Sequence, residues 1–341
     1  INQGGIIIEK REGNLIVNKE IYKKVAEDSD PHFPKEWLGL IGEYGWDHNI
    51  LYVYEDAGSL WVLIEWIEKN KLIQESQSLF KFPSNSGMYQ SEKLKFKINE
   101  NGIASEVSIL NGPQFKRRTP LSLTKKTFKI TPVKPIAVLR EEAENSYPPM
   151  ENSKSKKFDL VEIKNIDKSI KYDIRYASEN NFMGSKFYKT SHAFLQRPAA
   201  EALKRVNEKL RSYGFGLLIH DAYRPWYVTK MFWDATPEDK KIFVANPQNG
   251  SRHNRGCAVD LTLYELSTGN PVEMISGYDE FTERAFPYYY GGTTKQRWLR
   301  DLLRKNMESE GFSVYKYEWW HFDYKDWEKY GIGNLKFEDI K

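Results

Sequence analysis

Two short segments in the second half of the chain carry residue types that bind metal ions. The first is Ser251-Arg252-His253-Asn254-Arg255-Gly256-Cys257-Ala258-Val259-Asp260, and the second is Glu318-Trp319-Trp320-His321, about sixty residues further on. Together they supply two histidines, an aspartate and a glutamate. Three neutral or anionic ligands with a spare carboxylate are what a catalytic zinc site needs, since the fourth position is left for water and the carboxylate can act as a base. The two segments therefore predict metal-assisted hydrolytic chemistry.

The spacing within each segment limits how its side chains can meet. His253 and Asp260 are seven residues apart, and small residues between them, such as Gly256, let the backbone turn tightly near a metal. Glu318 and His321 are three apart, which places them on one face of a helix but on opposite faces of a regular strand. Because their aromatic neighbours favour a strand, the two can meet only where that strand is bulged or strongly twisted. The alternative is an aromatic core strand with one exposed glutamate.

A third segment, Asp221-Ala222-Tyr223-Arg224-Pro225, directly follows an apolar run at residues 216–219 that is typical of a strand. An arginine at a strand end could stabilise the oxyanion that forms when water attacks a carbonyl, because a guanidinium stays charged and donates in a fixed fork. Arg224 could instead form a salt bridge to Asp221. The sequence leaves both interpretations open.

Composition limits the remaining classes of function. The chain of 341 residues has a net charge of +4, from 51 basic and 47 acidic residues interspersed along it, so nucleic-acid binding is not expected. Cys257 is the single cysteine, which excludes an intramolecular disulfide and a zinc cluster of several cysteines. Any metal must therefore be bound by histidines and carboxylates. The sequence contains no run of about 18 apolar residues, so no membrane span is expected.

The length suits two domains, and the pattern of elements changes along the chain. Residues 1–135 are predicted to form a mostly β accessory domain, with strands that include residues 5–8, 60–66, 79–82 and 94–98. Residues 136–157 are rich in proline, serine and charge, which is typical of a linker.

Residues 158–341 show a mixed pattern that predicts a second domain of the α+β class. Helices are expected at residues 197–213 and 298–310, and Gly311 suits the C-terminal cap of the second helix. Strands are expected at residues 216–219 and within the aromatic run at 315–324.

The three segments together resemble the zinc D-alanyl-D-alanine dipeptidases of the vancomycin-resistance (VanX) type. The elements S-x-H-x-x-G-x-A-x-D and E-W-W-H occur in the order and near the spacing of that family, and their joint occurrence is highly specific. The resemblance covers about residues 158–324 and begins at Asp173-Ile174-Arg175-Tyr176-Ala177. It implies a peptidase-like catalytic domain with a central antiparallel sheet and helices.

Carried over residue by residue, the resemblance implies that His253, Asp260 and His321 bind one zinc ion. Glu318 matches the general base of the family, and Arg224 matches the arginine that stabilises the transition state.

Three further positions match residues that contact substrate in the family. Asp279 matches the carboxylate that holds the free amino end of a dipeptide, and Tyr176 and Ser251 match residues that line the substrate pocket. A carboxylate at the closed end of a site rewards a free ammonium and disfavours a blocked or extended N-terminus. The expected partner is therefore a small dipeptide substrate.

Three other residues have side chains that bind metals but are not expected to do so here. His192 and His220 match no ligand position of the family, so neither is expected to bind the metal. Cys257 departs from the small, inert residue expected at its position. A thiolate there could compete for zinc, but we expect a buried structural cysteine.

The first domain resembles the small β-domain at the C-terminal end of some penicillin-binding-protein-like serine hydrolases. The resemblance rests on a G-x-Y pattern at residues 87–89, two hairpin strands and the stretch Phe115-Lys116-Arg117-Arg118, and it implies an accessory module. An unrelated sheet is the alternative. Because the chain also begins with Ile1 rather than methionine, we expect a removed leader and a periplasmic or cell-envelope location, with the cytoplasm as the alternative.

The leading hypothesis is zinc-dependent hydrolysis of D-alanyl-D-alanine, or a closely related dipeptide, in cell-wall metabolism. A zinc D,D- or L,D-carboxypeptidase that acts on peptidoglycan stem peptides is the second hypothesis, and Asp279 weighs against it. A zinc fold that binds wall fragments without catalysis is the third, and Glu318 and Arg224 weigh against it.

Overall fold

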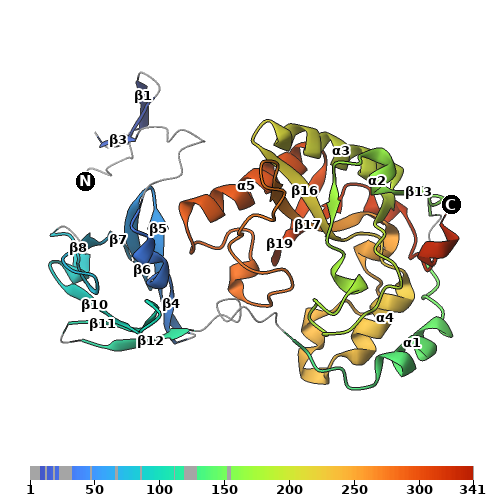
Figure 1. The fold of residues 1–341 in the computed structure, drawn as a ribbon, viewed down its shortest axis with the longest axis horizontal. Coiled ribbons are helices and arrows are strands. Elements are labelled where there is room, and N and C mark those ends of the chain that lie inside the picture. The colour runs from blue at the N-terminus through green and yellow to red at the C-terminus, as the bar shows by residue number, and fades with distance from the viewer. Residues whose placement is uncertain are drawn as a thin grey trace, which may run out of the picture. The chain divides into compact units, whose positions relative to one another are not determined.

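The computed structural model describes residues 8–11, 14–17, 20–22, 33–46, 48–65, 68–84, 87–110, 112–118, 129–151 and 155–340 (Figure 1). Residues 5–7 of the first predicted strand and residues 152–154 of the predicted linker lie outside this set. The chain divides into two compact units, residues 1–117 with 293–295, and residues 118–292 with 296–341.

The segment predicted as a linker contains a helix in its first half. Helix α1 (Ile136–Glu144) follows Pro135, and Leu139 and Ala143, one helical turn apart, are fully buried. The helix packs on helix α4 (Trp226–Ala235). Residues 136–144 are therefore part of the second unit, and the domain boundaries themselves stay a prediction.

The first unit consists mainly of strands. Strands β1 (Ile8–Arg11), β2 (Asn14–Val17) and β3 (Glu20–Tyr22) form one three-stranded sheet. A second, nine-stranded sheet has the order β7-β6-β5-β4-β12-β11-β10-β9-β8. Its strands are β4 (Gly42–Trp46), β5 (Asn49–Asp56), β6 (Ser59–Ile64), β7 (Glu68–Lys71), β8 (Ile73–Gln74), β9 (Leu79–Lys81), β10 (Lys93–Ile98), β11 (Ala104–Ile109) and β12 (Gln114–Arg118).

Alternating apolar residues explain the strands of this sheet. In β6 every second residue is buried, and in β10 the buried residues are Leu94 and Phe96. Such alternation directs one row of side chains into a core and the other toward solvent. The described parts of the predicted strands at residues 60–66, 79–82 and 94–98 are confirmed.

The second unit is built on a five-stranded sheet of order β14-β16-β17-β19-β18, in which only β14 and β16 are parallel. Its strands are β14 (Lys171–Tyr172), β16 (Phe215–Asp221), β17 (Ala258–Glu265), β18 (Phe312–Tyr315) and β19 (Glu318–Tyr324). Strands β13 (Leu160–Glu162) and β15 (Phe194–Gln196) form a separate pair. The predicted α+β fold with a central, mainly antiparallel sheet is confirmed.

Helices pack on this sheet through their apolar faces. Helix α3 (Arg197–Arg211) buries Leu203, Val206 and Leu210, which recur at helical spacing, and it packs on β16. Helix α5 (Thr294–Ser309) ends just before Gly311, whose φ of +87° suits glycine. Both helices were expected from the sequence and are confirmed. The remaining helical elements are α2 (Ile163–Ile166) and short 3₁₀ turns, among them η4 (Arg175–Ala177), which carries Tyr176, and η6 (Arg252–Arg255), which carries His253.

No helix among the described residues is both long and apolar enough to cross a membrane.

Candidate active site and metal centre

The register of the central sheet brings the predicted metal ligands together. Asp260 of β17 lies directly opposite His321 of β19, and on its other side Asp260 pairs with Asp221 of β16. Opposite residues in an antiparallel pair have their side chains on the same face. Two residues more than sixty positions apart in the sequence therefore share one spot on the sheet.

His253 reaches the same spot from the turn η6. Ser251 begins this turn as its N-cap, accepting a hydrogen bond from the His253 backbone N–H, while the Asn254 side chain accepts one from the Ser251 N–H. Gly256 ends the turn with a φ of +67°, and a β-carbon there would lie 2.5 Å from Leu160 Cδ2. The turn is thus fixed at both ends, and Gly256 is required for conformation and for space.

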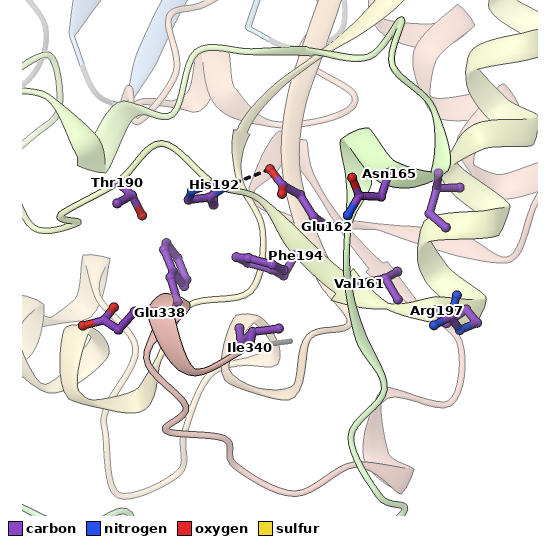
Figure 2. Close-up of a pocket in the computed structure, with 11 residues that line it drawn as sticks. Val161, Glu162, Asn165, Thr190, His192, Phe194, Arg197, Glu338 and Ile340 are labelled. Atoms are coloured by element: carbon purple, nitrogen blue, oxygen red, sulfur yellow. Dashed lines mark hydrogen bonds and ion pairs between the residues drawn. The ribbon is translucent and has the colours of Figure 1, made fainter.

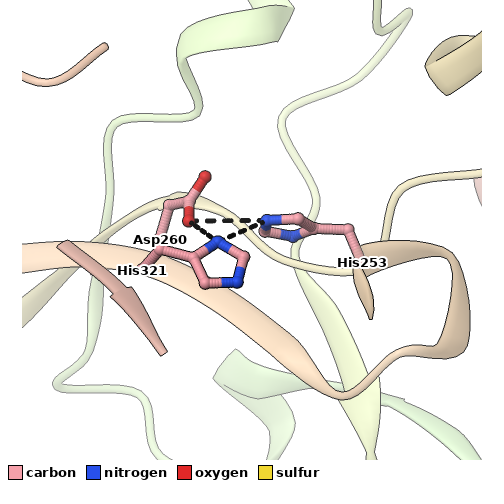
Figure 3. Close-up of side chains that lie close together, drawn as sticks. All are labelled: His253, Asp260 and His321. Carbon is pink, nitrogen blue, oxygen red and sulfur yellow. Dashed lines mark hydrogen bonds and ion pairs between the residues drawn. The ribbon is translucent and has the colours of Figure 1, made fainter. Parts of the chain in front are cut away.

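The donor atoms of the three residues converge (Figure 3). Asp260 Oδ1 lies 3.0 Å from His321 Nδ1 and 3.4 Å from His253 Nε2, and the two histidine nitrogens are 3.2 Å apart. Asp260 Oδ1 is a buried oxygen for which the described residues supply no hydrogen bond of good geometry. Buried polar atoms are rarely left without a partner. Three nitrogen and oxygen donors that point at one position are the set that a catalytic zinc ion takes, so the residues present fit this metal.

Outer partners orient the two candidate histidine ligands. The Nδ1 atom of His253 lies 2.7 Å from the Ala222 carbonyl oxygen, and His321 Nε2 lies 2.9 Å from Asp323 Oδ1. Such second partners fix the ring orientation of metal-binding histidines. The sequence interpretation missed Asp323, although it lies two residues after His321 and therefore on the same face of β19.

The strand that carries Glu318 and His321 is irregular where the sequence required it. Val314 of β18 pairs with Phe322, but the next residue, Tyr315, pairs with Glu318, so the register shifts across this step. Glu318 Oε2 consequently lies 3.8 Å from His321 Nδ1, on the same side as the metal donors. Burial raises the pKa of the Glu318 carboxyl to about 7, against the attraction of the neighbouring His321. The expected bulge or twist is confirmed.

Arg224 forms the salt bridge that was one of its two interpretations, and its role toward an oxyanion stays a prediction. Its Nε and Nη2 atoms donate to Asp221 Oδ2 at 2.9 and 2.7 Å, so the salt bridge is present. The guanidinium also lies over the rings of Tyr176 and Phe232, at 5.2 and 5.0 Å. Its positive charge partly offsets the rise that burial causes in the pKa of Glu318, so the two groups interact electrostatically.

Asp279 belongs to the same buried cluster. Tyr176 donates its hydroxyl to Asp279 Oδ2 at 3.0 Å, and Asp279 has a φ of +54°, a conformation that residues other than glycine rarely adopt. Burial raises the pKa of this carboxyl well above its usual range, and the negative charges of Asp260 and Glu318 add to that effect. Strained residues held by their surroundings concentrate at functional sites.

The other metal-binding residue types lie apart from this group. The group of candidate ligands among the described residues contains neither Cys257 nor a further histidine. Cys257 is fully buried, and burial raises the pKa of its thiol to about 12. His220 is buried with its Nδ1 atom 3.3 Å from the Asp173 carbonyl oxygen.

His192 lies in a separate pocket of about 570 Å³ (Figure 2). There its Nδ1 atom is 2.9 Å from Glu162 Oε1, beside the ring of Phe194.

Comparisons with known proteins cover the second unit. The sequence profile of a peptidase family described as D-ala-D-ala dipeptidase (Peptidase_M15) matches residues 156–337. A D-alanyl-D-alanine dipeptidase of Enterococcus faecalis is 34% identical over 171 residues, which are 45% of this chain and 85% of that protein. Another, of Escherichia coli, is 33% identical over 165 residues, which are 48% of this chain and 84% of that protein.

A solved structure, that of the LdcB LD-carboxypeptidase, covers 57% of this chain and 84% of its own, with 20% sequence identity and a TM-score of 0.32. A likeness at that level carries no conclusion about activity.

Proposed function

The chain belongs to the D-alanyl-D-alanine dipeptidase family of metallopeptidases, and from this premise we propose that it hydrolyses D-alanyl-D-alanine or a closely related dipeptide. The family is zinc-dependent in general. The cell-wall peptidase class is common to the relatives, whereas the dipeptide substrate and the roles of individual residues are our proposal.

One observation carries the proposal. A buried carboxylate that is not a candidate metal ligand, Asp279, shares a cluster with the three metal donors, with Glu318 and with Arg224. A site that contains a metal, a base and a cation can hydrolyse an amide bond. The additional carboxylate can pair with a free ammonium group, so it favours binding of a substrate that has one.

His253, Asp260 and His321 would hold the zinc ion, through Nε2, Oδ1 and Nδ1 respectively. When bound, zinc supplies a Lewis acid that polarises the substrate carbonyl and lowers the pKa of a water molecule to about 7.

Glu318 is the proposed general base. Its carboxylate lies beside His321, and its pKa of about 7 suits a group that takes a proton from the attacking water and passes it to the leaving amine near neutral pH. Both transfers use the same carboxylate, so the residue is restored after each turnover.

Arg224 is the proposed stabiliser of the negative charge that develops on the carbonyl oxygen. Asp221 and the two aromatic rings hold the guanidinium in place before substrate arrives. A donor that is already in place needs no reorganisation during the reaction. Such preorganisation is the main source of electrostatic catalysis.

Asp279 is the proposed partner of the substrate amino end. An ammonium group next to this carboxyl favours its ionised form and pairs with it, whereas an acylated amino end leaves a buried carboxyl without a charged partner. Selection of this kind distinguishes a dipeptidase from a carboxypeptidase that acts on longer peptides.

The test compares free and N-acetylated D-alanyl-D-alanine as substrates of the zinc-loaded full chain. We expect the free dipeptide to be hydrolysed with a kcat/KM at least about 100-fold higher than that of the acetylated form. Efficient cleavage of the acetylated form would support the carboxypeptidase hypothesis instead. If the zinc-loaded chain hydrolyses neither, the hypothesis of a zinc fold that binds wall fragments without catalysis is supported.

A further inference from the structure

Tyr278 joins two parts of the site that the sequence treats as separate. Its hydroxyl donates to Asp260 Oδ2 at 2.8 Å and lies 3.2 Å from the hydroxyl of Tyr176. Tyr176 in turn donates to Asp279 Oδ2 at 3.0 Å. An unbroken series of hydrogen-bonding contacts therefore runs from a candidate metal ligand to the carboxylate proposed for the amino end.

The backbone explains how neighbouring residues both reach this series. Tyr278 and Asp279 lie together in a turn, where side chains do not alternate as they do in a strand. Asp279 adopts the left-handed conformation in this turn, with a φ of +54°. The strain at Asp279 thus accompanies the placement of two adjacent side chains in one cluster.

The ring of Tyr278 is held independently of its hydroxyl. It packs against His220, Trp320 and Tyr176, with ring centroids 4.7, 5.6 and 6.3 Å away. The side chain is only 8% exposed. Replacement by phenylalanine should therefore keep the ring in place and remove the hydroxyl alone.

The two oxygens of Asp260 have different neighbours. Oδ1 faces the two histidine nitrogens, and Oδ2 accepts the Tyr278 hydroxyl. A hydrogen bond to the outer oxygen of a metal-binding carboxylate fixes which oxygen faces the metal. The hydroxyl of Tyr278 is placed to do this for Asp260.

The number of hydroxyl protons makes the two ends of the series depend on each other. When the Asp279 carboxyl is ionised, two tyrosine hydroxyls supply two protons for three contacts, so Tyr278 cannot donate to Asp260 and to Tyr176 at once. The hydrogen bonds made at one carboxylate therefore influence those available at the other.

We propose that Tyr278 is a positioning residue that holds Asp260 with Oδ1 toward the metal and, through Tyr176, links this orientation to the carboxylate of Asp279. The second half of this proposal rests on the proposed function, because there Asp279 receives the amino end of the substrate. The first half concerns zinc binding alone.

The first measurement is the zinc affinity of the full chain, read by competition with a chelator of known affinity. We expect Tyr278→Phe to bind zinc about tenfold more weakly than the wild type, because outer partners of metal ligands typically contribute that much. Tyr176→Phe keeps the Tyr278–Asp260 hydrogen bond and removes only the link to Asp279, so its zinc affinity should fall less than that of Tyr278→Phe.

The matched control is Tyr264→Phe. Tyr264 is also buried in the second unit, but its hydroxyl donates to the Ser169 carbonyl oxygen. Loss of this hydrogen bond should lower stability without changing zinc affinity. A zinc affinity of Tyr278→Phe equal to that of Tyr264→Phe would overturn the positioning role.

The second measurement is a double-mutant cycle of Tyr278→Phe with Asp279→Asn, read both as kcat/KM for D-alanyl-D-alanine and as zinc affinity. We expect the effect of Asp279→Asn on each quantity to be several-fold smaller when residue 278 is phenylalanine. Strict additivity in both quantities would refute the link. The zinc-affinity measurement needs no turnover. If the chain fails to hydrolyse the dipeptide, the proposed function is refuted, but the zinc affinities of the variants still test this inference.

Discussion

Two arginines, one in each unit, differ in how their guanidinium groups are held, and this difference matches the separate roles proposed for them. In the first unit, Arg117 of β12 donates from Nη1 to the carbonyl oxygens of Gly39 and Ala104 and to the Tyr44 hydroxyl, and from Nη2 to the carbonyl oxygen of Ile41. These acceptors are neutral and come from separate segments, so the guanidinium ties those segments together.

Arg224 in the second unit is held differently. Both of its hydrogen bonds to Asp221 go to a single oxygen, and the faces of the guanidinium rest on aromatic rings. This arrangement fixes the orientation of the Arg224 guanidinium with one acceptor residue instead of several. The comparison suggests a rule that can be tested: an arginine bonded to several backbone carbonyls stabilises a structure, whereas one aligned from one side by a carboxylate and two rings suits the role proposed for Arg224.

The largest expected effect is on the reaction alone. Glu318→Gln should lower kcat for D-alanyl-D-alanine by about 10³-fold, because the amide cannot accept the proton of the attacking water. Zinc content and melting temperature should stay close to those of the wild type, since the amide has nearly the same shape. Steady-state kinetics with metal analysis and thermal denaturation test this. Unchanged turnover would show that Glu318 is not the base.

Arg224→Lys tests whether the arginine of the second unit acts mainly in the reaction. Lysine keeps the charge but loses the fixed fork, so kcat/KM should fall by about 10²-fold. The effect on the free energy of unfolding should be smaller than that of the corresponding change in the first unit. Kinetics and urea denaturation of the same preparation give both numbers. An equal loss of stability and activity would mean that Arg224 is primarily structural.

Arg117→Lys is the matched change in the first unit. One ammonium group cannot reach the same acceptors, and buried carbonyls left without donors cost about 1–3 kcal/mol each. We expect the first unit to lose about 2–4 kcal/mol of unfolding free energy. The kcat/KM of the zinc-loaded chain should stay the same, and a fall in kcat/KM at temperatures where the first unit is folded would contradict the separation of roles.

The smallest expected effects come from removing one hydroxyl beside each arginine. Tyr44 accepts from Arg117 and donates to the Leu40 carbonyl oxygen, so Tyr44→Phe should cost about 1–2 kcal/mol of stability with no change in kinetics. Tyr188 donates to Asp221 Oδ1 at 2.6 Å, so Tyr188→Phe should loosen the carboxylate that orients Arg224 and lower kcat/KM several-fold. Thermal denaturation and steady-state kinetics measure both effects. A kinetic effect of Tyr44→Phe without one of Tyr188→Phe would contradict the separate roles of the two arginines.

The sequence predicts the site better than it predicts the first unit. The metal donors and Glu318 lie in two short segments whose spacing already requires a tight turn and a strand irregularity, and both features are present. The nine-stranded sheet of the first unit is different. Its order places β4 next to β12, although dozens of residues separate these strands in the sequence. Local alternation predicts that strands form but contains no signal for which distant strands pair.

Inside the site, the partners of the ligands were the part that spacing could not predict. Tyr278 donates to Asp260 across 18 residues of sequence, from a turn in which the next residue, Asp279, has a positive φ. Asp323 is an exception, because its distance of two residues from His321 already indicated a shared face. A search for polar residues two positions from each candidate ligand in a strand would have found it.

The pairing of Asp260 with His321 across adjacent strands has a consequence for how the proposed zinc ion would bind. Two of the three donors are set by the backbone hydrogen bonds of the central sheet, and the third by a turn that is capped at both ends. The chain then loses little conformational entropy when an ion binds, because the site is already ordered in the folded apoprotein. Chelation should correspondingly leave a folded apoprotein that regains its metal quickly.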